Sequence, residues 1–310
     1  MAKLQRFLII ITLACWGVFS FINHPARAGE WYLVRNGISF GISGMVLMDE
    51  EKDFRSFAIV HDNKRADEGR LAIVTIKPNE EPEYLPLSWP DNIELPVDLE
   101  GLTAVPSLDR PSFMASTSRG KIYHFQIDAN QNISVLKVLG LPGIVPGSNF
   151  EAFAIQIIED KFLAVWAHRG SNEDPAVLYW GWFDPTTDLI SLQGSTEVKV
   201  PWPIGNVRHI SDLKIDPTGK TYITSATDNG NDGPFESAVY MAGTFGIQNE
   251  QIQFEANPVL EPLYQFDSYK AEGIELIPGF VEGVAIGTDD ENMGSRMYLN
   301  WQEGIGAPQL

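Results

Sequence analysis

Three glutamates stand at equivalent places in the chain, and their recurrence is the clearest sign of chemistry in the sequence. Glu100, Glu151 and Glu272 each open a short apolar stretch, and Ser43 and Ser211 open two similar stretches. Acids that converge inside a protein are unfavourable unless they are paired or bind a cation, and calcium prefers oxygen ligands. We therefore expect the glutamates to be metal ligands or acid–base groups, with Ca²⁺ as the cofactor.

Polar loops follow the second apolar stretch of each repeat and supply further candidates. Their acidic members are additional candidate metal ligands: Asp62, Asp228, Asp289 and Asp290. The segment 228–233 resembles a calcium-binding loop, but Gly230 and Val239 stand where an EF-hand needs ligands, so it is not an EF-hand. A structural role is the alternative for the glutamates, which would then cap strands and bond neighbouring backbone amides.

The elements that would bring these residues together are repeated strands. After each opening stretch comes a second apolar stretch, for example Phe57-Ala58-Ile59-Val60 or Val284-Ala285-Ile286-Gly287, and then a third, in which four of five copies carry an aliphatic-Tyr pair. Counted from Gly44 to Gly101, Ala152, Asp212 and Gly273, the copies begin 57, 51, 60 and 61 residues apart. This period suits a four-stranded antiparallel blade, and blades arranged radially form a β-propeller.

The last copy is one strand short, and the start of the chain supplies a spare strand. Glu30-Trp31-Tyr32-Leu33-Val34 is an apolar strand that precedes the first repeat. If it pairs with the last blade, the ring closes without an open sheet edge. We predict an all-β fold, a five-bladed propeller of four-stranded blades closed by this N-terminal strand, within one domain at 29–310. A sixth, degenerate blade is the alternative.

Residues 1–28 have the pattern of a signal peptide. Lys3 and Arg6 precede an apolar run from Phe7 to Ile22, and Ala26-Arg27-Ala28 is a small-x-small cleavage site. The run of 16 residues is short for a membrane span of about 20 residues. We expect export to the periplasm or the cell exterior, without a stable membrane span after cleavage; an uncleaved anchor is the alternative.

The net charge and the cysteine content limit the kinds of partner molecule and of chemistry that this chain can use. The formal net charge is −19; removal of residues 1–28 discards Lys3, Arg6 and Arg27 and no acids, which gives −22. A strongly acidic chain is unsuited to nucleic acid or anionic membranes and favours a cation or a small-molecule ligand. The only cysteine, Cys15, lies in the leader, so neither disulfides nor cysteine nucleophiles serve the mature chain. We expect a monomer.

Several segments together resemble a known family. Leu99-Glu100-Gly101-Leu102, Ala271-Glu272-Gly273-Ile274 and Gly287-Thr288-Asp289-Asp290 are similar to motifs of the phytase-like, or esterase-like, propellers of exported bacterial proteins, most of unknown function. The resemblance covers most of residues 43–300. It implies calcium-dependent hydrolysis of phosphate esters in an acidic central cup, and two of the five ring positions depart from the pattern because they are serines.

Two functional hypotheses follow. The first is a non-catalytic exported propeller whose acidic cup binds a cation, a ligand or a partner. The second is a calcium-dependent phosphoesterase in which Glu100, Glu151, Glu272 and Asp290 act as ligands or base, and Arg119, Arg169 and His168 stabilise phosphate charge. We favour the first, because the sequence shows no complete catalytic set.

Overall fold

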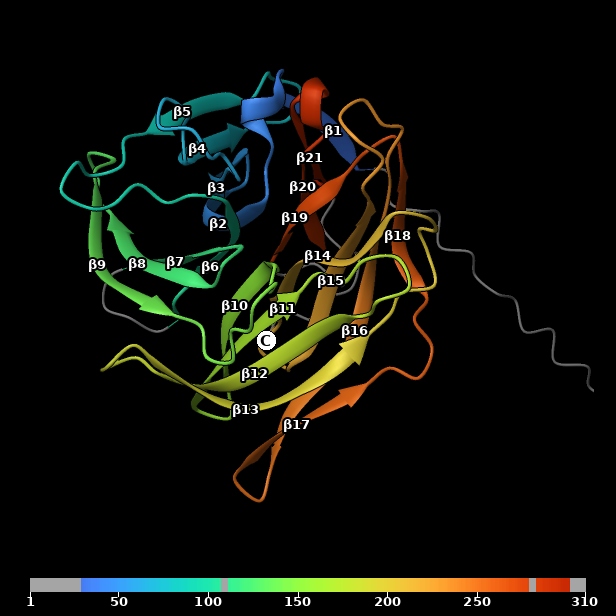
Figure 1. The fold of residues 1–310 in the computed structure, drawn as a ribbon. Helices are drawn as coiled ribbons and strands as arrows, with labels where there is room; N and C mark the ends of the chain where they lie inside the picture. The colour runs from blue at the N-terminus through green and yellow to red at the C-terminus, as the bar shows by residue number, and fades with distance from the viewer. Residues whose placement is uncertain (1–28, 107–110, 279–282, 302–310) are drawn as a thin grey trace, which may run out of the picture.

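The computed structural model describes residues 29–106, 111–278 and 283–301. Within these ranges the chain forms five antiparallel sheets arranged around one axis, which is a five-bladed β-propeller (Figure 1). The predicted fold class and blade number are confirmed, and the described residues form no sixth blade. The predicted signal peptide, residues 1–28, lies outside the described residues. No helix among the described residues is long and apolar enough to cross a membrane.

The first three blades follow the chain in order, each from the innermost to the outermost strand. Blade 1 consists of β2 (Gly44–Glu51), β3 (Phe54–Val60), β4 (Leu71–Ile76) and β5 (Glu83–Leu87). Blade 2 consists of β6 (Leu99–Ala104), β7 (Phe113–Thr117), β8 (Lys121–Ile127) and β9 (Ile133–Gly140). Blade 3 consists of β10 (Phe150–Ile158), β11 (Lys161–His168), β12 (Ala176–Asp184) and β13 (Leu189–Val198).

The last two blades depart from this simple order. Blade 4 contains β14 (Val207–Ile215), β15 (Lys220–Thr227), the long β16 (Glu236–Gln248), β17 (Gln251–Ala256) and β18 (Pro262–Asp267). Blade 5 contains β19 (Ala271–Leu276), β20 (Val284–Thr288), β21 (Ser295–Leu299) and the N-terminal strand β1 (Glu30–Arg35). Two short 3-10 helices, η1 (Ile38–Phe40) and η2 (Glu291–Met293), complete the described elements.

The N-terminal strand closes the ring as the sequence predicts. β1 pairs antiparallel with β21, with Trp31 opposite Tyr298 and Tyr32 opposite Met297. The Gly29 amide donates a hydrogen bond of 3.1 Å to the Tyr298 hydroxyl. One blade thus joins both ends of the described chain, so the first and last blades cannot separate without breaking a sheet.

Two outer strands lie elsewhere than the sequence suggests. The sequence predicts 198–200 and the proline-bearing 260–263 as the fourth strands of blades 3 and 4, since an outer edge strand tolerates proline. In blade 3 the fourth strand is β13, which ends at Val198. In blade 4 the role is divided: β17 pairs with the C-terminal half of β16 and β18 with its N-terminal half. The 13-residue β16 is long enough to hold both.

The hydrophobic core lies between the blades rather than within one of them. Between blades 5 and 1, for example, Met45, Phe57 and Ile59 pack with Ala285 and Met297, all fully buried. The blades approach closely here, since a Cβ on Gly287 would lie 2.5 Å from Ile42. Gly287 on β20 therefore permits the tight packing of blade 5 against blade 1.

Each of the three predicted glutamates sits at a β-bulge. The pairing of β6 with β7 passes from Leu99 to Gly101, that of β10 with β11 from Phe150 to Ala152, and that of β19 with β20 from Ala271 to Gly273. Each glutamate is the residue that the register omits. A bulge leaves its extra residue unpaired and redirects its side chain. The repeated Glu-Gly/Ala signature is therefore the sequence of a bulge at the start of an inner strand.

Candidate functional site

The three glutamates converge at one end of the central axis, as predicted. Their strands β6, β10 and β19 belong to blades 2, 3 and 5 and surround the axis with β2 and β14 (Figure 1). Glu100, Glu151 and Glu272 are all buried. Acidic loop residues from blades 1, 4 and 5 join them, and we call this group of side chains the central cup.

One half of the cup is organised by Arg208, which is also largely buried. Arg208 Nη1 lies 2.6 Å from Glu272 Oε1 and 3.7 Å from Glu151 Oε2, and Nη2 lies 2.9 Å from Asp228 Oδ2. Arg169 Nη1 lies 3.3 Å from the other oxygen of Glu151. Burial alone would raise the pKa of Asp228, but Arg208 lowers it below its usual range. These acids are therefore held by fixed protein cations.

Lys270 extends the paired half towards blade 5. Its Nζ lies 3.1 Å from Glu272 Oε1, 3.4 Å from Asp289 Oδ2 and 2.5 Å from Glu291 Oε1, and its side chain is almost fully buried. Burial opposes its charge, but the acids around it, Glu272 and Asp289 foremost, raise the pKa of Lys270 above its usual value. Lys270 remains charged and links the inner strand β19 to the loop after β20.

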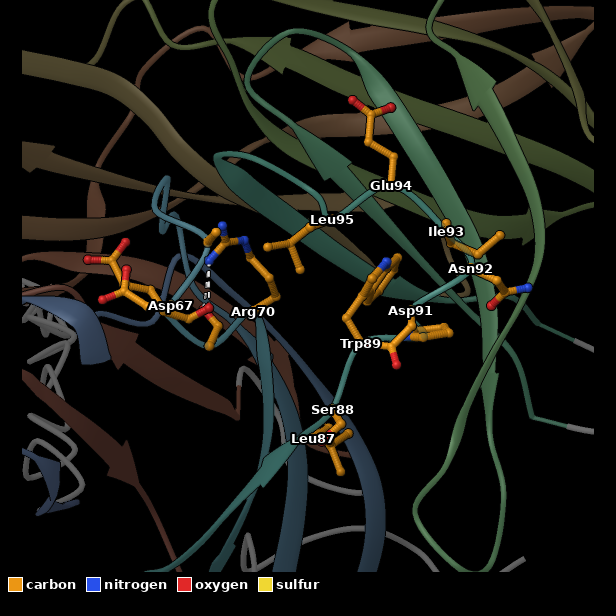
Figure 2. A pocket seen from close by; sticks show the side chains of 14 residues that line it. Asp67, Arg70, Leu87, Ser88, Trp89, Asp91, Asn92, Ile93, Glu94 and Leu95 are labelled. Atoms are coloured by element: carbon orange, nitrogen blue, oxygen red, sulfur yellow. Dashed lines mark hydrogen bonds between the residues drawn. The ribbon is translucent and has the colours of Figure 1, made fainter.

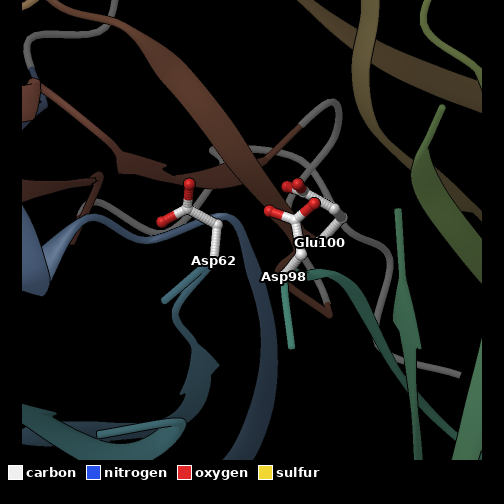
Figure 3. A group of neighbouring side chains, drawn as sticks. All are labelled: Asp62, Asp98 and Glu100. Atoms are coloured by element: carbon white, nitrogen blue, oxygen red, sulfur yellow. The ribbon is translucent and has the colours of Figure 1, made fainter. Parts of the chain in front are cut away.

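The other half of the cup is an acidic cluster, defined here as Asp62, Asp98 and Glu100. One carboxylate oxygen from each lies within 4.8 Å of those of the other two. Asp62 comes from the loop after β3, whereas Asp98 and Glu100 come from the start of β6 (Figure 3). Glu100 is only 7% exposed, and its carboxylate makes no hydrogen bond or ion pair with any residue in the described ranges. It is a buried charge without a fixed counter-ion.

Only one of the two carboxylate oxygens of Asp98 accepts a hydrogen bond from a described residue. Its Oδ2 accepts a short hydrogen bond from Ser118 Oγ. Lys64 Nζ lies 2.8 Å from Oδ1 and forms an ion pair with it. This buried oxygen accepts no hydrogen bond from a described residue. The Lys64 side chain is 63% exposed. Among the described residues, this exposed ammonium is the single ion-pair partner of the acidic cluster.

Burial and mutual repulsion perturb the cluster strongly. Burial first, and then Glu272, raise the pKa of Asp62 from 3.8 to about 6. Burial first, and then Glu151 and Asp62, raise the pKa of Glu100 well above its usual value. Asp289 is shifted in the same direction by burial although Lys270 opposes the shift. Perturbed carboxyl groups of this kind are typical of ligand-binding or catalytic sites, although structural networks also produce them.

The structure divides the sequence-predicted residues into two groups. Asp62, Glu100, Glu151, Glu272, Asp228 and Asp289 all reach the cup, but only the first two belong to the acidic cluster. Asp290 instead stabilises the loop that contains it. Its carboxylate oxygens accept hydrogen bonds from the Lys270 amide at 2.9 Å, Thr288 Oγ1 at 2.9 Å and Arg296 Nη1 at 3.2 Å.

The predicted phosphate-binding residues do not form a set. Arg169 is paired with Glu151. His168 Nδ1 accepts a hydrogen bond of 3.2 Å from the Gly170 amide, and burial lowers the pKa of His168. Arg119 is exposed in the turn between β7 and β8 and makes no ion pair with a described residue. The cup therefore carries an excess of acids over available cations.

Sequence reasoning missed three residues of the cup: Asp98, Arg208 and Lys270. A signal for two of them exists in the repeat, because Asp98 and Lys270 stand two residues before Glu100 and Glu272. Both residues stand just before an inner strand and its bulge, so the position two residues before a column glutamate is a further candidate for the cup. Arg208 lies in the part of β14 where the register with β15 is irregular, which no sequence pattern revealed.

Below the cup, one side chain crosses the axis. Lys214 Nζ of blade 4 donates a hydrogen bond of 2.8 Å to the Leu102 carbonyl of blade 2, and lies 3.7 Å from Asp212 Oδ2. The two blades are not neighbours, so this side chain spans the channel. On its far side a separate hollow of about 240 Å³ is lined by residues of all five inner strands. The cup and this hollow are thus separate spaces.

A groove of about 690 Å³ lies beside the acidic cluster, between the β3–β4 loop and the segment that leads to β6. Figure 2 shows Arg70 and Leu95 on one side of it and Trp89 and Asp91 on the other. Arg70 joins the two segments, with Nε donating to the Pro96 carbonyl at 2.5 Å and Nη2 to the Arg65 carbonyl at 2.8 Å. This connection fixes the loops that carry Asp62 and Asp98.

No family model and no curated protein sequence matches the chain. Solved structures show the same fold. The endo-arabinase of Bacteroides thetaiotaomicron superposes with a TM-score of 0.50 at 8% identity, over 88% of this chain and 99% of that one. A glycoside hydrolase superposes with a TM-score of 0.50 at 10% identity, over 86% and 60%. The GH43 endo-arabinanase of Bacillus licheniformis gives 0.49 at 12%, over 86% and 95%. The propeller fold is supported, and the resemblance to phytase-like propellers gains no support.

Proposed function

We propose that this propeller binds a hard divalent cation, Ca²⁺, in the central cup through Asp62, Asp98 and Glu100. The observation that carries the proposal is the Glu100 carboxylate, which is buried, faces two further carboxylates and has no partner among the described residues. A buried carboxylate of this kind is unfavourable unless a cation compensates it. Three carboxylates, with water completing the shell, are a ligand set that calcium accepts.

The distribution of fixed charge supports the same conclusion. Glu151 and Glu272 are already held by arginine and lysine, so a cation gains most from the acidic cluster. The Asp98 oxygen that lacks a hydrogen bond is contacted by the exposed ammonium of Lys64 through an ion pair alone. The leader-like residues 1–28 favour a calcium-rich exported compartment. The phosphoesterase alternative has less support, because among the described residues Arg169, Arg208 and Lys270 are held by acids, and Arg119 is a single exposed cation.

Calorimetric titration of the chelator-stripped protein with CaCl₂ tests the proposal. We expect one site per chain and a calcium-dependent rise in melting temperature, since a ligand that binds only the folded state stabilises it by RT ln(1 + [L]/Kd). Glu100→Gln and Asp98→Asn remove ligands and should weaken binding by at least about tenfold, or about 1.4 kcal/mol. Asp228→Asn is the matched control, because this acid of the cup is held by Arg208. Absence of binding by the wild type, or equal loss in the control, contradicts the proposal.

A second candidate function is acid–base hydrolysis of a glycosidic bond. The observation that favours it is the unequal environment of two buried carboxyls: Glu100 has a strongly raised pKa, whereas Glu272 contacts both Arg208 and Lys270. One protonated and one ionised carboxyl form the pair that glycosidases use. The solved structures named above include glycoside hydrolases, which is consistent with this chemistry but establishes only the fold.

Hydrolysis of a panel of aryl glycosides and arabinan, with an aryl phosphate for comparison, tests the second candidate. Turnover of a glycoside that disappears in both Glu100→Gln and Glu272→Gln supports it. Turnover of the phosphate alone, abolished by a chelator, instead favours the phosphoesterase hypothesis. If no substrate is turned over while calcium binds, the protein acts by binding.

A further inference from the structure

Lys64 is the most exposed of the cations that contact acids of the cup; Arg169, which is held by Glu151, is 28% exposed. Arg208 and Lys270 are largely buried and each contacts three carboxylates. Lys64 contacts one, Asp98, through an ion pair at 2.8 Å, and its side chain is 63% exposed. A lysine ammonium on a flexible stem can leave a carboxylate and enter solvent at little cost, whereas a buried arginine cannot.

The position of Lys64 makes it a competitor for the same oxygen that a cation would use. Its Nζ occupies Asp98 Oδ1, and Asp62 lies only two residues away on the same loop. The acids Asp98, Asp62 and Glu100 all favour its charged form. Two positive charges cannot occupy this small space without strong repulsion. A bound divalent ion would therefore have to displace the ammonium or accept its proximity.

We propose that Lys64 is a built-in, displaceable counter-ion that sets the affinity and lowers the occupancy of the cation site, leaving Asp98 when the ion binds. This inference rests on the cation-binding function proposed above. The lysine keeps the acidic cluster partly compensated while no ion is bound, and it makes binding an exchange of one cation for another. The affinity of the site is then weaker than its three carboxylates alone would give.

The matched variants are Lys64→Met, which removes the charge and keeps an unbranched stem, and Lys64→Arg, which keeps the charge. Lys77→Met is the control, because Lys77 is a surface lysine paired with Glu83 at 2.8 Å outside the cup. A unit charge about 6 Å from a divalent ion, in a medium close to water, changes Kd by about tenfold. We expect Lys64→Met to bind calcium about tenfold more tightly, and Lys64→Arg and Lys77→Met to bind within about twofold of the wild type.

A second measurement follows Lys64 itself. Brief acetylation of wild-type protein, read by peptide mass spectrometry, should modify Lys64 several-fold faster with saturating calcium than with chelator, whereas Lys77 should not change. Unchanged or weaker calcium affinity in Lys64→Met, or equal labelling in both conditions, overturns the inference while the wild-type site still stands. If the wild type binds no calcium, the proposed function itself fails and this inference falls with it.

Discussion

Replacing Asp62 by Asn should stabilise the cation-free protein and at the same time weaken its cation site. In the folded protein, burial and Glu272 raise the pKa of Asp62 from 3.8 to about 6. The folded state therefore binds the proton more tightly than the unfolded chain does. The free energy of unfolding must fall as pH rises from about 4 to about 6 and stay low above that range.

The size of the effect follows from the shift. A difference of about 2 pKa units corresponds to about 3 kcal/mol at neutral pH. Asp62 is partly exposed and Lys64 lies near it, so solvent and the ammonium screen part of this energy. We expect Asp62→Asn to raise the free energy of unfolding by about 1–2 kcal/mol at pH 8 in chelator, and to have little effect at pH 4.

The assay is urea unfolding of wild type and variant at pH 4 and pH 8 with chelator, repeated at pH 8 with calcium. With calcium at 100 times the wild-type Kd, the wild type should gain about 2.7 kcal/mol and a variant that binds tenfold more weakly about 1.4 kcal/mol, so the advantage of the variant shrinks by about 1.3 kcal/mol. Asp228→Asn is the control and should lose stability at pH 8, because its carboxylate is paired with Arg208. If Asp62→Asn is less stable than the wild type at pH 8 in chelator, the electrostatic reasoning is refuted.

Three further predictions concern other parts of the molecule. Arg208→Met leaves Glu151, Glu272 and Asp228 without their shared partner, and urea unfolding should show a loss of about 3–5 kcal/mol, with a smaller loss for Arg208→Lys. Calcium affinity measured by calorimetry should rise with pH from about pH 5 to beyond about pH 6, because Asp62, with a pKa of about 6, and Glu100, whose pKa is raised well above its usual value, must both lose a proton to bind the ion; a flat profile excludes both as ligands. Deleting residues 29–36 removes β1, with the buried Tyr32 and Val34, and should abolish cooperative thermal unfolding, whereas Leu33→Ser, on the exposed side of the same strand, should unfold cooperatively.

Much of the fold was predictable because the chain repeats one local pattern. Apolar stretches of strand length, bounded by turn residues, give the strands, and their common spacing gives the blades. The closing strand was predictable because the last repeat is one strand short and the strand at 30–34 belongs to no repeat. The outer strands of blades 3 and 4 were less predictable, because β13 carries mostly exposed side chains and β17 and β18 share one partner.

Only those residues of the site that belong to the repeated sequence pattern were predictable. Glu100, Glu151 and Glu272 occupy one column, so their convergence followed from the ring. Their division into paired and unpaired groups depends mainly on Arg208, which contacts acids of blades 3 and 5 far away in the sequence. Such pairings follow from side-chain geometry across the axis, and no spacing along one chain segment encodes them. The contacts of Lys270 with Glu272 and of Asp290 with Thr288 and Arg296 are local, but they depend on the conformation of the folded loop.

Lys214 ties together two blades that are not neighbours in the ring, because its ammonium reaches from β14 to a carbonyl of β6. The same ammonium lies near the Asp212 carboxylate of its own blade, so the tie is anchored on both sides. Any displacement of blade 4 relative to blade 2 has to break this contact. The two blades are therefore mechanically coupled through one side chain.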